Sequence, residues 1–211
     1  MRLWAEVVST VSRVKRLLVL VALLYVLSYI SGWYLVSTGS PSATLIVGRI
    51  QQAVLTQRPF TTVIGALKGG NLPEAILFTF LYNLASGAFL STTAPGIIPL
   101  LGGAFTIMVT LVRGFIIGLT YPEVLSSSTG GFVVGMGTLL LEMGAYVFSG
   151  AAGINIALAP LMPKREGTQS RSGAFKAAWK DAARLYVIVI ILLALGAVWE
   201  MTGLFLLIRP S

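Results

Sequence analysis

The sequence predicts an all-α protein, a polytopic transmembrane helical bundle with about five spanning helices and additional interfacial amphipathic helices. Of its 211 residues, 56% are hydrophobic and only 10% are charged. The mean hydropathy is +0.88, which is typical of membrane proteins and not of soluble domains. A helix needs about 20 residues to cross a bilayer, and five apolar stretches reach or exceed that length. We therefore expect one integral membrane domain over residues 1–211.

A window of about twenty residues locates the five spans. They cover approximately residues 14–36, 72–91, 97–120, 130–158 and 183–208. Arg13, Lys15 and Arg16 precede the first apolar run, which is too long for a signal peptide, so we expect this helix to be retained. The fourth span has about thirty residues, so we expect it to tilt, to extend beyond the bilayer, or to break near its glycines.

Two connections are predicted to contain amphipathic helices. In the first, residues 37–71, the apolar residues Ile46, Ile50 and Val54 recur at helical spacing, which favours a helix lying at the membrane interface. In the second, residues 159–182, apolar residues share one helical face while lysines and arginines occupy others. Two interpretations of this basic connector stay open: a solvated connection whose charges fix topology, or a docking surface for lipids or a partner.

The basic residues predict the orientation in the cell (plasma) membrane. The N-terminal segment and the 159–182 connector carry most of them, and five spans place these two regions on the same side. Positive charge accumulates on the cytoplasmic side of membrane proteins. We expect a cytoplasmic N-terminus and basic connector, with the 37–71 segment and the C-terminus outside. The net charge of +8 then reflects topology, so we expect membrane lipids and other membrane or envelope proteins as partners and no nucleic acid, with homo-oligomerisation left open.

The chain contains no cysteine and no histidine. Disulfides, thiolate metal sites, imidazole bases, Ser-His-Asp triads and the HExxH zinc motif are therefore excluded. We predict no catalytic residue, no metal site and no cofactor. An intramembrane enzyme that uses two carboxylates as general acid and base is a further possible class of function, but the sequence contains no motif that supports it.

Glu142 and Glu200 lie deep inside two of the predicted spans. A carboxylate at mid-membrane costs about 2.5 to 3.5 kcal/mol on insertion scales, so it rarely persists without a partner or a role. Helical spacing and depth bring both acids toward Arg113, Asn83 and Thr138, and we predict that these five residues form one buried polar centre. We expect Arg113 to pair with Glu200 and to reach toward Glu142. Two interpretations stay open: a structural ion pair, or a proton or cation pathway.

Small residues on the same spans predict close helix contacts. The predicted packing positions are Gly114, Gly118, Gly131, Gly135, Gly150 and Gly153. The first four form two GxxxG motifs, which are common in membrane helices and weak as evidence for dimers.

Four motifs, in this order, resemble the stage II sporulation protein M family. The segment FLYNLASGAF carries Asn83 at the first of two commonly paired asparagines, with Leu84 in place of the second. The segment RGFIIG carries Arg113 at an asparagine position and retains Gly114 and Gly118.

The third and fourth motifs contain the two acids. LLLEMGAYVFSGAAGINIA resembles the clearest family signature, in which Glu142 matches while Thr138 and Leu139 replace a histidine and a glycine. ALGAVWEMTG resembles an alanine-rich end of the last span, and there Glu200 matches. The resemblance extends over nearly the whole chain.

The resemblance implies a polytopic helical membrane protein. Family members from sporulating bacteria are associated with an envelope-remodelling complex that contains cell-wall hydrolases, and other members occur in non-sporulating bacteria and in archaea. We expect a non-enzymatic multi-pass membrane protein that acts as a scaffold or assembly component of a cell-envelope complex. The alternative is a transporter or channel for a small solute or an ion, a proton or another cation, that uses the buried carboxylates.

Overall fold

The structure, a computed structural model, describes residues 2–208, with the backbone alone for residues 123–127 and 166. The described residues form helices and turns and contain no strand. The α-helices are α1 (Arg2–Ser37), α2 (Pro41–Thr56), α3 (Phe60–Lys68), α4 (Leu72–Tyr82), α5 (Leu101–Ser127), α6 (Thr129–Leu158) and α7 (Arg171–Ile208). A π-helix (Asn83–Thr93) and a 3₁₀ turn (Ala94–Ile97) continue α4, and two further 3₁₀ turns (Ala159–Leu161 and Pro163–Glu166) join α6 to α7.

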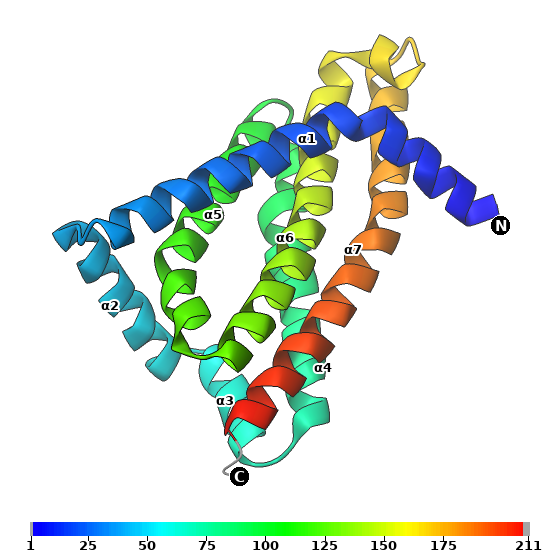
Figure 1. Cartoon of the computed structure of the whole chain (residues 1–211). Coiled ribbons are helices and arrows are strands. Elements are labelled where there is room, and N and C mark those ends of the chain that lie inside the picture. Colours follow the sequence, from blue (N-terminus) through cyan, green and yellow to red (C-terminus); the bar gives the residue numbers. More distant parts are fainter. Residues whose placement is uncertain (1, 209–211) are drawn as a thin grey trace.

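Five of these helical segments are long and apolar enough to cross a membrane. They are Arg2–Ser37, Leu72–Ile97, Leu101–Pro122, Thr129–Leu161 and Arg171–Ile208. The predicted all-α polytopic fold is therefore confirmed. Figure 1 shows α6 between α5 and α7, with α1 running across the bundle.

The observed helices differ from the expected ranges in several places. The second span continues to Ile97, and the next helix begins only at Leu101, because a Pro-Gly pair at Pro95 and Gly96 ends the preceding helix. The helix expected within the basic connector is the beginning of α7, which runs without interruption into the last span. Helix α6 also continues through all its glycines, so the break that we considered is absent from the described Thr129–Leu158 segment.

The bundle has two different ends. At one end, which we call the basic end, lie the α6–α7 connection (residues 159–170) and the start of α7, and α1 passes beside them while its first turns project away from the bundle (Figure 1). At the other, which we call the cover end, α2 leads toward α3, and the α5–α6 turn and the last turns of α7 lie nearby (Figure 1). The interfacial helix predicted from Ile46, Ile50 and Val54 is α2.

Helix α1 packs against α5 through glycines on both helices. A Cβ on Gly118 would meet the Tyr29 carbonyl oxygen and approach the Trp33 nitrogen to 3.0 Å. In return, a Cβ on Gly32 would meet the Phe115 carbonyl oxygen. Backbone atoms cannot move aside as a flexible side chain can, so both positions require glycine. The GxxxG motif of α5 therefore serves a contact within one chain.

An ionic cluster joins α1 to α7 at the basic end. The buried Asp181 carboxylate, 1% exposed, accepts ion pairs from Arg13 and Arg184, each at 3.1 Å. Arg184 also pairs with Glu6 of α1 at 3.0 Å. Glu6, Arg13 and Asp181 lie in the two regions that the sequence marks as basic. Their charges form ion pairs between helices, so these regions also help to hold α1 and α7 together.

We predict that Gly118→Ala weakens the bundle. The added methyl group has to push α1 away from α5, and overpacking of this kind costs about 1–3 kcal/mol. The free energy of unfolding, measured in mixed micelles by SDS titration, should fall by that amount. Gly48→Ala is the control, because a Cβ at Gly48 meets nothing within 4 Å; an equal loss in both variants would contradict the packing described here.

We also predict that Asp181→Asn destabilises the α1–α7 contact. Removing one partner of a buried ion pair costs about 3–5 kcal/mol when the other charge stays buried. Here Arg13 and Arg184 are 39% and 30% exposed, so water compensates them in part and we expect about 1–3 kcal/mol in the same titration. The control Glu74→Gln removes an exposed carboxylate. A smaller effect for Asp181→Asn than for Glu74→Gln would disprove the role of the cluster.

Candidate functional site

The second span changes from an α-helix to a π-helix at Asn83. The π-helix extends over eleven residues, Asn83–Thr93, in a segment rich in small side chains. Segments of π-helix are rare, and they are frequent at functional sites. Gly87 at its centre allows a close approach of α6, since a Cβ there would lie 2.8 Å from the Tyr146 hydroxyl and 3.0 Å from its ring. The π-helix and α6 are thus in direct contact beside the polar centre.

Arg113 of α5 binds this π-helix. Its Nη2 donates hydrogen bonds to the Gly87 carbonyl oxygen at 2.9 Å and to Ser91 Oγ at 3.0 Å. Its Nη1 lies 3.4 Å from the Tyr25 hydroxyl oxygen, and its guanidinium carbon lies 4.0 Å from the centre of the Tyr146 ring. One side chain therefore links α1, α5, α6 and the π-helix.

The expected ion pair between Arg113 and Glu200 is wrong. Within the described part of the chain, no salt bridge joins Arg113 to either glutamate. The guanidinium instead donates hydrogen bonds to a carbonyl oxygen and a hydroxyl group and lies over the face of an aromatic ring. These contacts stabilise a cation in a poorly solvated site. Arg113 acts on Glu142 only as a nearby charge.

A network of hydroxyl groups fixes the second half of the π-helix. Thr92 Oγ1 donates to Ser149 Oγ at 2.9 Å, and Thr93 Oγ1 donates to the Ser149 carbonyl oxygen at 3.0 Å. Thr93 is also 2.8 Å from the Tyr186 hydroxyl, and Thr106 donates to the Thr92 carbonyl oxygen at 2.8 Å. Sequence reasoning missed Thr92 and Thr93, although two adjacent threonines in an apolar span were an available signal.

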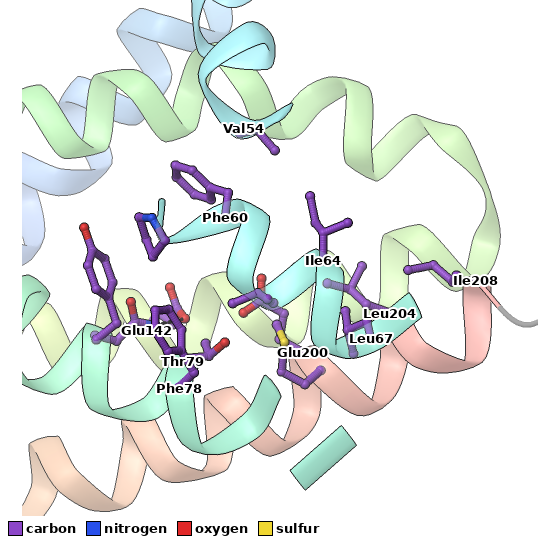
Figure 2. Close-up of a pocket in the computed structure, with 15 residues that line it drawn as sticks. Val54, Phe60, Ile64, Leu67, Phe78, Thr79, Glu142, Glu200, Leu204 and Ile208 are labelled. Atoms are coloured by element: carbon purple, nitrogen blue, oxygen red, sulfur yellow. Dashed lines mark hydrogen bonds between the residues drawn. The ribbon is translucent and has the colours of Figure 1, made fainter. Parts of the chain in front are cut away.

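Glu142 and Glu200 line a cavity of about 450 Å³ between α3, α4, α6 and α7, which we call the first cavity. Glu142 Oε1 accepts a hydrogen bond from Asn83 Nδ2 at 2.6 Å. Figure 2 shows Phe60 and Ile64 of α3 on one side of this cavity and Glu142 with Thr79 on the other. The predicted grouping of Asn83 with both acids is thus present in the structure.

A second cavity, of about 770 Å³, lies beneath α2. Glu200 lines it as well, together with Thr138, Gly131 and Gly135 of α6. Since Glu200 belongs to the walls of both cavities, its carboxylate lies where they adjoin. Thr138, predicted as part of the polar centre, is placed on the side of the second cavity.

Three polar groups at these cavities lack a hydrogen-bond partner. Thr79 is 9% exposed and Thr138 is 2% exposed, and neither hydroxyl oxygen has a partner. In the described part of the chain, Glu200 forms no salt bridge, and no hydrogen bond to it is found. Unmade hydrogen bonds of buried polar groups cost free energy, so these groups are available to a ligand.

The remaining glycines that we predicted to pack helices contact different parts of the bundle. A Cβ on Gly150 would lie 3.2 Å from Val21 of α1. Gly153 touches the backbone of Thr92, and its own carbonyl oxygen lies against Gly96. Gly114 contacts Ser28 and Tyr25 of α1. Gly131 and Gly135 are buried and line the second cavity.

The polar side chains of the two cavities define what they can bind. Among the described residues, no group of three or more acidic, histidine or cysteine side chains could hold a metal ion. Inside apolar walls, the two carboxylates accept hydrogen bonds, while the Asn83 amide, which donates to Glu142, and the two hydroxyls can donate as well as accept; the carboxylates therefore suit a ligand with donors.

The model of the family described as stage II sporulation protein M matches residues 21–202. The chain belongs to the stage II sporulation protein M family. The match contains every residue of the predicted polar centre and most of the walls of both cavities. Comparison with curated proteins and with solved structures found no match.

A double-mutant cycle separates the observed role of Arg113 from the expected ion pair. Arg113→Met should cost about 2–4 kcal/mol, because it removes hydrogen bonds of a charged donor and a cation–π contact. Its coupling to Glu200→Gln should stay below about 0.5 kcal/mol, the limit for groups that do not touch. Its coupling to Ser91→Ala should exceed that limit. Strong coupling of Arg113 to Glu200 together with weak coupling to Ser91 would contradict the observed contacts and support the ion pair.

Proposed function

We propose that this protein is a non-enzymatic, multi-pass component of a cell-envelope complex, where it assembles or organises partner proteins. The observation that carries the proposal is the difference between the two ends of the bundle. Both acid-lined cavities lie toward the cover end, whereas the bundle between them and the basic end is densely packed. A one-sided site of this kind suits recognition better than conduction.

The packing of α6 supports this interpretation. From Ala151 to Ala157 every residue of α6 is buried. The buried hydroxyl groups at this level, those of Thr92, Thr93, Thr106 and Ser149, are hydrogen-bonded within the bundle. A pathway for ions needs polar groups that are free to exchange partners along its length, and satisfied hydroxyls between packed helices do not offer that.

The distribution of charge supports an orientation as well. Basic residues concentrate at the basic end, so the positive-inside rule assigns that end and the N-terminus to the cytoplasm. The cover end and the C-terminus then lie outside the plasma membrane. Trp33 and Tyr34, which are 49% and 62% exposed near the end of α1, suit the aromatic belt at the outer interface. Partners in the envelope would meet the protein at the cover end.

A transporter or channel is the second candidate, and the cavities themselves favour it. Two carboxylates that form no salt bridge with an arginine in the described chain, next to two unpartnered hydroxyls, resemble the polar centre of a membrane pathway. A transporter or channel has to let a solute or an ion cross the bundle, whereas a scaffold does not.

Flux measurements distinguish the two candidates. We expect proteoliposomes that contain the purified protein to dissipate gradients of H⁺, Na⁺ and K⁺ no faster than protein-free liposomes do. On native gels of mildly solubilised membranes, the protein should migrate in an assembly larger than itself. A flux that Glu200→Gln abolishes and Glu74→Gln preserves would overturn the scaffold proposal in favour of transport.

A further inference from the structure

We propose that the two cavities form a binding site for an amphiphile with a primary ammonium head, whose charge lies between Glu142 and Glu200 and whose apolar chain fills the cavities. This inference goes beyond the proposed function, and it would hold equally for a scaffold or a transporter. It stands on the geometry of the cavities and on the buried polar groups that lack partners.

The polar groups of the site define the head group. Among the described wall residues, Glu142 has one oxygen bonded to the Asn83 amide, while Glu200 has no partner. The hydroxyls of Thr79 and Thr138 are also without partners. Ionised carboxylates only accept hydrogen bonds, and a buried anion is expensive unless a cation compensates it. The complementary head group is therefore positively charged and carries several N–H donors.

The walls define the rest of the ligand. Phe60, Val63 and Ile64 of α3 line the first cavity, and Phe78 and Leu204 belong to the same apolar wall. Volumes of about 450 and 770 Å³ match those of small-molecule sites, which are mostly apolar with a few placed polar groups. A bare metal ion would use none of this surface. A lipid phosphate would be repelled by the two carboxylates, so a single-chain amine fits better than a phospholipid.

The cover end offers a way in. The end of α3 is anchored, since Ala66 and Leu67 are buried in a cluster with Ala75 of α4 and Met201 of α7. Helix α2 is attached less firmly, with Ala43 as its one buried residue in the described chain. Its residues Val47, Ile50 and Val54 lie over the second cavity, so we assign the entrance to the edge beneath α2.

Titration with three twelve-carbon probes tests the site. Dodecylamine carries a charged head with N–H donors, dodecyltrimethylammonium carries the charge without donors, and dodecanol carries no charge. Binding to the purified full-length protein in a non-ionic detergent is measured by calorimetry and by thermal stabilisation. We expect dodecylamine to bind at least about tenfold more tightly than either of the others, which corresponds to one charge-assisted hydrogen bond.

Variants then locate the binding. Glu200→Gln should weaken dodecylamine about tenfold or more, Thr138→Val should weaken it less, and Glu74→Gln, which changes an exposed carboxylate away from the cavities, should leave it unchanged. If Glu200→Gln does not fold, Ile64→Trp fills the first cavity from α3 and should block the probe. Equal binding of all three probes, equal stabilisation by Na⁺, K⁺ or Mg²⁺ alone, or unchanged binding in both Glu200→Gln and Ile64→Trp would overturn the proposal.

Discussion

The contact between the Arg113 guanidinium and the π-helix is the interaction on which the rest of the structure depends. Inside a bilayer no water solvates an arginine, so its charge has to be stabilised by the protein. The Gly87 carbonyl, Ser91 and the Tyr146 ring provide that stabilisation. Because α5, α6 and the π-helix meet at this one side chain, the contact sets their relative positions. Because these contacts hold the Arg113 guanidinium, it does not form a salt bridge with Glu142 or Glu200 in the described chain.

The two glutamates therefore belong to the cavities and not to an ion pair. Asn83 orients Glu142, while Glu200 lies between two hollows that α2 and α3 cover. Beyond them, the threonine and serine network and the small residues of α6 close the bundle toward the basic end. The structure thus has a densely packed half and a hollow half, and the proposals for recognition and for an ammonium ligand both follow from that division.

The sequence predicted the parts of this account that depend on one helix at a time. Hydropathy located the spans, and helical spacing placed Asn83, Glu142 and Glu200 together, because both rules need only the chain's own periodicity. The partner of Arg113 could not be predicted, since it is a backbone carbonyl exposed by a π-helix that the spacing of FLYNLASGAF does not reveal. The cavities depend on how α2 and α3 fold back over the bundle, which no single-helix pattern contains. The helix expected in the basic connector was predicted as a separate interfacial element, and its continuity with the last span as the single helix α7 was not, because its charged residues are unlike those of a spanning segment.

An experimental structure of the purified protein, at a resolution that shows side chains, tests the central claim most directly. The account predicts that Arg113 Nη2 lies within hydrogen-bonding distance of the Gly87 carbonyl oxygen, over the Tyr146 ring, with Asn83–Thr93 in the π conformation and Glu200 facing the cavities. A regular α-helix through Asn83–Thr93, with the guanidinium bound to the carboxylate of Glu142 or Glu200, would contradict it.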